Sequence, residues 1–336
     1  MSEGSFFQKK LWRWLPGILI SVAAVVFLLF FVDWQQFAVA LQSISITTIL
    51  LLFLLSLLSL IFRSLSWKAL LNEESTFSDS FFIESIGYLL NNLLPLRLGE
   101  LGRAVLMGSK TGRGFFYTLS SIVVERLMDV AFAAISLLIA LPFLTKVNWS
   151  SSTPVITLVV VLVGVVVVWL IAKKQSIIAE WINTMGEKHT WFGKKLAPAF
   201  VSVLKGMEVF ASLKVMLKSI GFMAITWLTY WITFFLVIKD IYPLAPFWWA
   251  IFTNGILAMG IAIPSAPGGL GVWEASFVGA LSILGGTQSL SIAGALVIHL
   301  VNYVFIGVLG SLGLIRMGTS FADLVRNITR QKQTSE

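Results

Sequence analysis

Long apolar segments alternate with short polar ones along most of the chain. Several reach about 18 residues, which is enough for a helix to cross the hydrocarbon core of a bilayer. We therefore expect an all-α, polytopic integral membrane protein with about six full transmembrane helices. They are Leu15–Val32, Ile46–Phe62, Phe115–Leu144, Val155–Ala172, Ile220–Ile238 and Leu290–Ile315. No polar stretch is long enough for a separate soluble domain, so residues 1–336 are expected to form a single membrane domain.

Two further apolar segments are interrupted by proline and glycine. Phe81–Leu94 runs into Pro95 and Phe247–Ile263 runs into Pro264, and after each proline the chain follows the same pattern, P-x-x-x-G-x-L-G. Proline removes a backbone donor and glycine opens conformations closed to other residues, so each helix should break there. Because broken helices at membrane depth are tolerated only inside protein or beside water, we predict two re-entrant hairpins.

Basic residues support one orientation of these segments. With a cytoplasmic N-terminus, only Lys146 and Lys239 among the lysines and arginines fall outside, as the positive-inside rule requires. Arg63 marks the inner end of the second helix. The first half then reads helix out, helix in, hairpin from inside, helix out, and the second half is its inverted copy. We therefore predict two inverted structural repeats, residues 15–145 and 154–316.

Composition narrows the classes of function. The chain is 57% hydrophobic, which is too apolar for a soluble domain. Without cysteine it has no disulfide, no thiol catalysis and no cysteine-ligated metal, and its two histidines lie far apart. The net charge is +8. We interpret it as a charge that orients the protein in the membrane and attracts anionic headgroups, rather than as a sign of nucleic-acid binding. Much of it lies in residues 173–218, a basic cytoplasmic loop with an amphipathic helix expected near Leu196–Leu213.

The strongest candidate site is a cluster of ionisable residues around the first break. Charged groups inside a membrane are costly, so each one is a hypothesis of function. The cluster, which we expect to bind a lipid headgroup, comprises Arg97, Glu100, Arg103, Glu125, Arg126 and Asp129. The forked arginine guanidinium fits phosphate oxygens, and the carboxylates would balance it or receive a cationic headgroup or a proton. The alternative is that these residues pair only with each other and fix the orientation.

The second hairpin carries less charge. Its candidate residues are Pro264, Gly268, Gly269, Gly271 and Glu274, of which only Glu274 ionises. The glycines permit close backbone approach to a ligand, or simply tight packing between helices. On the last helix, His299 and Asn302 are three residues apart and share a face, which suits a proton or polar relay. A hydrogen bond between helices is the more common use of such residues.

Three motifs, in this order, resemble those of a known family. They are N-x-x-L-P-x-R-x-G-E-x-x-R at Asn91–Arg103, E-R-x-x-D at Glu125–Asp129 and P-x-x-P-G-G-x-G-x-x-E at Pro264–Glu274. Together they resemble the transmembrane, flippase-like domain of lysylphosphatidylglycerol synthases, here as a stand-alone member without the soluble aminoacyl-transfer domain. The resemblance implies a multi-pass plasma-membrane protein whose ligands are lipids: an anionic or aminoacylated phospholipid, or a polyprenol-linked lipid. The matched residues of the two hairpins would then line the lipid path from opposite sides.

The function we expect is translocation of a phospholipid, or another phosphate-bearing lipid, between the leaflets of the plasma membrane. Both termini would be cytoplasmic. We expect no enzymatic activity and no cofactor or metal, because the chain has no P-loop, no G-x-S-x-G and no histidine-rich cluster. One alternative is a non-catalytic membrane subunit that assists a lipid- or glycan-modifying enzyme, and a less favoured one is an enzyme acting on a lipid headgroup. A homodimer or a partner enzyme stays open.

Overall fold

The computed structural model describes residues 34–94, 97–144, 173–188, 201, 204, 212–261, 266–324 and 326. The predicted spans Leu15–Val32 and Val155–Ala172 lie outside the described residues, as does most of the helix predicted near Leu196–Leu213. The predicted repeats 15–145 and 154–316 each begin outside the described residues, and their boundaries stay a prediction.

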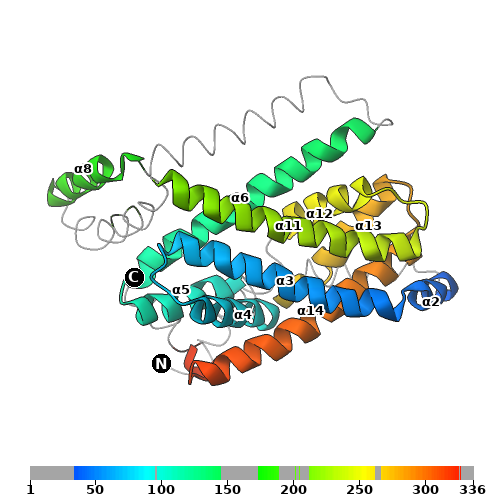
Figure 1. Ribbon diagram of the computed structural model, residues 1–336, viewed down its shortest axis with the longest axis horizontal. Coiled ribbons are helices and arrows are strands. Elements are labelled where there is room, and N and C mark those ends of the chain that lie inside the picture. Colours follow the sequence, from blue (N-terminus) through cyan, green and yellow to red (C-terminus); the bar gives the residue numbers. More distant parts are fainter. Residues whose placement is uncertain are drawn as a thin grey trace, which may run out of the picture.

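Every regular element of the described residues is a helix (Figure 1). In chain order they are α2 (Trp34–Ser43), α3 (Ile46–Leu70), α4 (Phe77–Leu93), α5 (Leu98–Thr111), α6 (Phe115–Ala140), η2 (Leu141–Phe143), α8 (Gln175–Lys188), α11 (Leu213–Ile241), α12 (Trp248–Gly260), η4 (Pro267–Gly269), α13 (Val272–Ile283) and α14 (Gln288–Arg316). Three of them, α3, α11 and α14, are long and apolar enough to cross a membrane. The predicted all-α membrane fold is confirmed.

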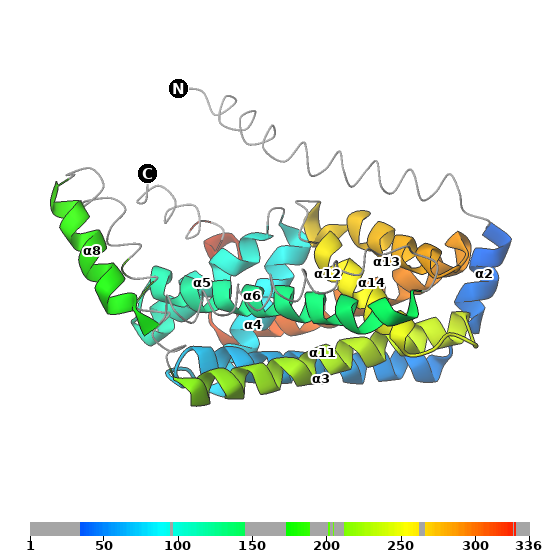
Figure 2. The ribbon, with the colours of Figure 1, turned by 90° about the horizontal axis from the view of Figure 1, so that it is seen from above.

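The helices α3 and α11 form an antiparallel pair that runs the length of the bundle (Figures 1 and 2). At one end, the backbone N–H of Ser45 and the hydroxyl of Thr48 donate to Asp240 at 3.0 and 2.7 Å. At the other end, the hydroxyls of Ser66 and Ser219 lie 2.7 Å apart. Small polar residues of this kind let two apolar helices approach closely and bond across their interface.

Each half of the chain packs its first hairpin helix against the last long helix of the other half. The helix α4 lies along α14, where a Cβ on Gly310 would lie 2.5 Å from the Cβ of Leu89. The helix α12 lies along α6, where a Cβ on Gly255 would lie 3.0 Å from a methyl carbon of Leu137. At both contacts a glycine makes room for a side chain of the facing helix. The two hairpins therefore pack against their long helices in the same way.

The helices α4 and α5 form a hairpin whose two open ends lie together. Lys110, near the end of α5, approaches Asp79, near the start of α4, to 3.5 Å. At the closed end, Arg97 precedes α5 in a left-handed conformation with φ of 53°, which is uncommon for a residue with a side chain. A Cβ on Gly99 would lie 1.9 Å from the carbonyl oxygen of Gly87, so the two helices touch backbone to backbone.

The second hairpin, α12 and α13, is interrupted by the short helix η4. Pro264 itself lies outside the described residues, but Gly268, Gly269 and Gly271 have φ values of 66°, 74° and 82°, which side chains rarely adopt. The two breaks meet: Arg97 Nη2 donates to the carbonyl oxygen of Ile261 at 2.7 Å, and η4 packs against α4. The described parts of the two breaks therefore contact each other, although Arg97 is exposed and no residue of η4 is buried.

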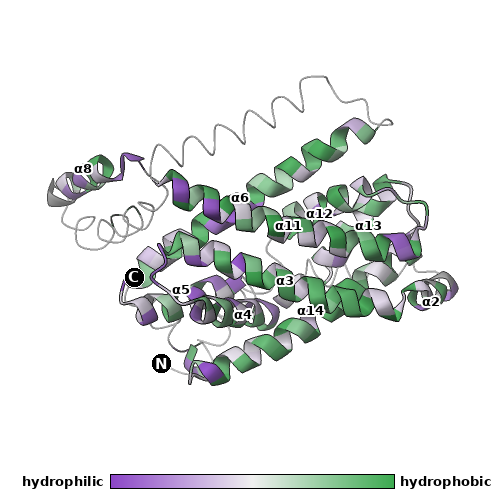
Figure 3. Cartoon of the chain, viewed as in Figure 1, coloured by the Kyte–Doolittle hydropathy of each residue, from purple (hydrophilic) through white to green (hydrophobic). Residues whose placement is uncertain are grey.

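The helix α8 stands apart from the bundle, beside the start of α11 (Figures 1 and 2). Figure 3 shows that α3, α11 and α14 are mostly apolar along their length, whereas α8 and the first turns of α11 carry polar residues. On α8, the apolar side chains of Ile177 and Trp181 are exposed. The basic loop therefore contains the helix α8, and the helix expected near Leu196–Leu213 stays a prediction.

Candidate functional site

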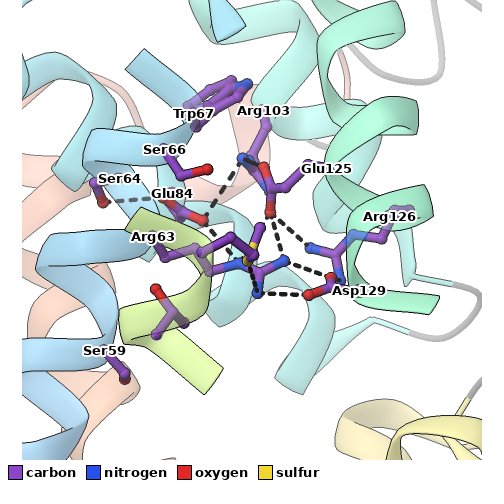
Figure 4. Close-up of polar contacts among 12 residues, drawn as sticks. Ser59, Arg63, Ser64, Ser66, Trp67, Glu84, Arg103, Glu125, Arg126 and Asp129 are labelled. Atoms are coloured by element: carbon purple, nitrogen blue, oxygen red, sulfur yellow. Dashed lines mark hydrogen bonds and ion pairs between the residues drawn. The ribbon is translucent and has the colours of Figure 1, made fainter. Parts of the chain in front are cut away.

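Arg63, on α3, is the centre of a buried network of ion pairs (Figure 4). Its Nη2 lies 2.6 Å from Glu125 Oε1 and 2.6 Å from Asp129 Oδ2, and its Nε lies 3.2 Å from Glu84 Oε1. The forked guanidinium offers enough donors to serve three carboxylates at once. Its side chain is only 3% exposed, so these carboxylates take the place of water.

Arg103, on α5, is the second buried cation. Its Nη2 lies 2.6 Å from Glu125 Oε2 and 3.6 Å from Glu84 Oε1, and its Nη1 lies 3.5 Å from Glu100 Oε2. The guanidinium also lies over the ring of Trp67, 4.1 Å from its centroid, which adds a cation–π contact. Arg103 is therefore held by four helices, α3, α4, α5 and α6, and its charge is fully engaged.

Arg126, on α6, forms the outer edge of the network and is 30% exposed. It contacts Glu100 through Nε at 3.4 Å, Glu125 through Nη2 at 3.2 Å and Asp129 through Nη1 at 3.1 Å. Glu100 and Asp129 are 15% and 19% exposed, whereas Glu84 and Glu125 are fully buried. The network thus has a closed side around Arg63 and an accessible side around Arg126.

The network sets three arginines against four carboxylates. Its members are Arg63, Arg103, Arg126, Glu84, Glu100, Glu125 and Asp129. The excess carboxylate is partly stabilised by the Ser64 hydroxyl, which donates to Glu84 at 2.9 Å. Arg97 adds a fourth cation at the hairpin tip, and it makes no ion pair within the described part of the chain. Removing one member of such a cluster leaves a buried charge without a partner, which costs about 3–5 kcal/mol.

A polar cavity of about 90 Å³ adjoins Arg63. It is lined by Ser56, Ser59, Leu60 and Arg63 of α3, Tyr88 of α4, Tyr230 of α11, and Asn302, Phe305 and Ile306 of α14. Its walls therefore come from both halves of the chain, close to the middle of the long helices. The volume has room for several water molecules. Because Arg63 belongs to both, the cavity and the ion-pair network are continuous.

A second buried pair joins the second hairpin to the last helix. His299 Nδ1 is hydrogen-bonded to Glu274 Oε1, and His299 Nε2 lies 3.1 Å from the carbonyl oxygen of Gly268. Glu274 Oε2 accepts the backbone N–H of Gly271 at 2.7 Å, which caps α13. The indole of Trp273 stacks on the imidazole, with 4.7 Å between ring centroids. Only the 3-10 turn, α13 and α14 supply these groups.

The structure brings most of the predicted site residues of the first hairpin together. Glu100, Arg103, Glu125, Arg126 and Asp129 form one network, as the alternative of mutual pairing requires, and Arg97 lies at its edge. In the second hairpin, Glu274 meets His299. His299 is hydrogen-bonded to Glu274 and Asn302 lines the cavity, and a relay between the two stays a prediction.

Two members of the network, Arg63 and Glu84, were not among the predicted site residues. Arg63 was interpreted as the inner end of the second helix, but α3 continues to Leu70 and buries it. Glu84 could have been predicted from the sequence, because it is the single acidic or basic residue in the apolar run Phe81–Leu94. A lone carboxylate at membrane depth needs a cation, and that rule would have pointed to a buried arginine nearby.

Fold and site together define a polytopic α-helical membrane protein with an ion-pair network inside its bundle. Comparison with known families matches residues 14–310 to the lysylphosphatidylglycerol synthase TM region, and the chain belongs to this family. The family is a membrane domain associated with lipid modification or flipping. No curated protein and no solved structure matches the chain.

Proposed function

We propose that this protein moves a phospholipid, or another phosphate-bearing lipid, between the two leaflets of a membrane. The observation that carries this proposal is the polar cavity that both halves of the chain line, joined through Arg63 to a buried charge network. Apolar bundles have no structural need for such a feature, and intramembrane ionisable groups mark substrate and ion pathways. Transporters built from repeats hold their substrates at the interface between the halves, near mid-membrane.

Arg97 is the residue that we assign to the first contact with the phosphate. Arg63 and Arg103 are each paired with buried carboxylates, so their role is to hold the helices and the charge pattern in place. Among the described residues, the partner of Arg97 is a neutral backbone carbonyl, that of Ile261. Exchange of that carbonyl for a phosphate oxygen would create a charge-assisted hydrogen bond, which is the stronger of the two. Arg126, partly exposed beside it, would extend the basic surface.

Passage of the headgroup requires the hairpins to move. The cavity of about 90 Å³ has room for several waters but not for a whole phospholipid headgroup. The contact between the two breaks, from Arg97 to Ile261, closes the space between the hairpins. Separation of the breaks would open a polar route along which the headgroup passes while the acyl chains stay in lipid. Alternating movement of two related halves is the general pattern for such folds.

Lipid flipping in reconstituted vesicles tests the proposal. Vesicles would contain headgroup-labelled lipid, either phosphatidylglycerol, its aminoacylated form or a polyprenol phosphate, and an impermeant quencher would report the outer leaflet. The Arg97→Gln variant should flip about 10- to 100-fold more slowly, which corresponds to the loss of one charge-assisted hydrogen bond. Arg113→Gln is the matched control, since Arg113 is exposed and its ion pair with Glu74 lies at the surface, and it should match wild type.

The outcomes of that experiment test the position of the lipid path and the translocation activity independently. Equal rates for Arg97→Gln and wild type would place the lipid path away from the hairpin tip. A wild-type protein that flips none of the lipids would contradict translocation altogether. We place the protein in the plasma membrane with both termini in the cytoplasm, on the distribution of lysine and arginine, and we propose that it is not an enzyme.

A second candidate function, a membrane subunit that assists a lipid- or glycan-modifying enzyme, is favoured by α8 alone. This helix stands outside the bundle and exposes Ile177 and Trp181. If it serves as a docking helix, replacement of both residues by serine should abolish the function of the assembly in cells while Arg97→Gln leaves it intact. The opposite result would favour translocation.

A further inference from the structure

We infer that the Glu274–His299 pair is a proton-binding site, and that the proton it carries couples lipid movement to a proton gradient. The pair joins the second hairpin to α14, it shares no residue with the ion-pair network, and it is buried against Trp273 and Tyr303. The bound proton concerns the pair alone. The coupling of that proton to lipid movement rests on the proposed function.

The hydrogen-bond partners of His299 fix the number of protons. Its Nε2 faces the carbonyl oxygen of Gly268, and because a carbonyl only accepts, Nε2 must carry a hydrogen. Its Nδ1 faces Glu274 Oε1, whose second oxygen already accepts the N–H of Gly271. One further proton is needed between Nδ1 and Oε1. It makes either an imidazolium beside a carboxylate or a neutral imidazole beside a carboxylic acid, and both forms hold the same number of protons.

Loss of that proton would break the contact between α13 and α14. A bare Nδ1 would then face a carboxylate, so two lone pairs would oppose each other where a hydrogen bond had been. A shift of the remaining hydrogen from Nε2 to Nδ1 would restore the contact with Glu274 but leave Nε2 opposed to the Gly268 carbonyl. One proton therefore decides whether His299 binds both Glu274 and Gly268.

The same proton controls the position of the break. Gly268 and Gly271 are the residues that give the second hairpin its irregular backbone, with φ of 66° and 82°. Through Gly268 and Glu274, His299 holds both ends of this turn against α14. Tyr303 adds a third tie, as its hydroxyl donates to the carbonyl oxygen of Pro267 at 3.3 Å. With the proton bound the turn is docked, and without it the hairpin is free to move away from α14.

The surroundings of the pair leave it free to change charge. The titratable group beside it is Tyr303, on the same helix as His299 and 4.8 Å from it between ring centroids. Within the described residues, the helices packed against α13 and α14, namely α2, α3, α4, α11 and α12, place no lysine, arginine or carboxylate in ion-pair contact with either residue. On the α11 side, the neighbour of Trp273 is the apolar Phe234, with 6.2 Å between the two ring centroids. No fixed charge therefore holds the pair in one state.

The proton itself can be observed without any transport assay. His189 and His299 are the two histidines of the chain, so a His189→Gln protein labelled with nitrogen-15 histidine reports on His299 alone. In detergent micelles we expect one proton in the hydrogen bond between Nδ1 and Glu274, on either atom, at the acidic end of the pH range in which the protein stays folded, and its loss at the alkaline end. In Glu274→Ala the hydrogen bond should be absent at every pH, because alanine offers Nδ1 no partner. A pair that holds no proton between Nδ1 and Glu274 anywhere in this range would overturn the inference.

The coupling between proton and lipid is tested by measuring how labelled lipid is distributed between the two leaflets. If one proton moves per lipid, a difference of one pH unit across the vesicle should distribute the labelled lipid about tenfold unequally at steady state, and a protonophore should abolish the difference. Glu274→Gln and His299→Gln keep hydrogen-bonding side chains but cannot exchange this proton, so their distributions should be equal on both sides. Ser282→Ala, a change on α13 that removes only a local bond to Val278, should retain the wild-type asymmetry.

Each outcome decides one point. Wild-type flipping that ignores the gradient, or variants that keep the asymmetry, would overturn the coupling and leave translocation standing. Absence of flipping with every lipid would overturn translocation and the coupling with it. Asymmetry that only Glu274→Gln and His299→Gln lose would support the inference.

Discussion

The two hairpins hold their buried charges in different ways. In the first, Arg63 and Arg103 are locked between carboxylates, and arginine does not lose its proton in a protein. In the second, one carboxylate faces one histidine, and a single proton sets the charge of both. Both hairpins present a side chain of their second helix, Arg103 or Glu274, to the long helix that follows. One interface is therefore permanent and the other is switchable.

This difference suggests a division of labour between the halves. A network centred on arginines keeps its cations through every step, which suits a scaffold beside a cavity. A pair that gains and loses a proton changes its contacts with the backbone, which suits the moving part. The comparison makes the second hairpin the mobile one, and the following variants test that assignment from the largest expected effect to the smallest.

Loss of Arg63 should have the largest effect on stability. Arg63→Met leaves Glu84, Glu125 and Asp129 without their central cation, and we expect the free energy of unfolding to fall by about 3–5 kcal/mol. His299→Gln should cost under about 2 kcal/mol, since an amide can still bond Glu274. Denaturant unfolding in detergent would measure both. Equal losses for the two variants would break the proposed contrast between a fixed and a switchable interface.

A methyl group between α4 and α5 should have the next largest effect. In Gly99→Ala the new carbon would meet the backbone oxygen of Gly87 at 1.9 Å, and because backbone cannot rotate away, we expect a cost of about 1–3 kcal/mol or more. Gly279→Ala on α13 is the control: nothing lies within 4 Å of its added carbon, so the variant should be neutral or up to about 1 kcal/mol more stable. A tolerated Gly99→Ala would show that the first hairpin is not rigid.

Loss of the Asn91 side chain should have the smallest effect. Asn91 Oδ1 accepts the backbone N–H of Gly99 at 2.8 Å, which serves an otherwise unpaired donor in the first turn of α5. Asn91→Ala should cost about 1 kcal/mol, as for other helix caps. Its neighbour Asn92 makes no side-chain hydrogen bond to a described residue, so Asn92→Ala should change stability by less than about 0.5 kcal/mol. The difference between the two alanine variants isolates the cap.

The fold was largely predictable, because an apolar run long enough to cross a bilayer is most stable as a membrane-spanning helix. The hydrophobic pattern placed α3, α11 and α14, and the proline–glycine breaks placed the two hairpins near their observed positions. Helix ends were less accurate. The predicted second helix stopped at Phe62, because Arg63 interrupts the apolar pattern, but buried carboxylates let α3 continue to Leu70.

The site was predictable only in part, for a related reason. Spacing within one segment showed that Glu125 and Asp129 share a helix face, and both do bind Arg63. The pairing of Arg63 with Glu84 depends on how α3, α4 and α6 pack, and no periodicity within a single segment encodes that. The same holds for Glu274 and His299, which sequence analysis considered separately and which packing of α13 on α14 brought together.

The order of the network members along the chain bears on how the protein is made. All of them lie between Arg63 and Asp129, whereas the surface on which α4 rests belongs to α14, near the end of the sequence. During synthesis, the nascent first half can pair its own buried charges before the second half leaves the ribosome. Its surfaces toward α11, α12 and α14 stay uncovered until those helices are made.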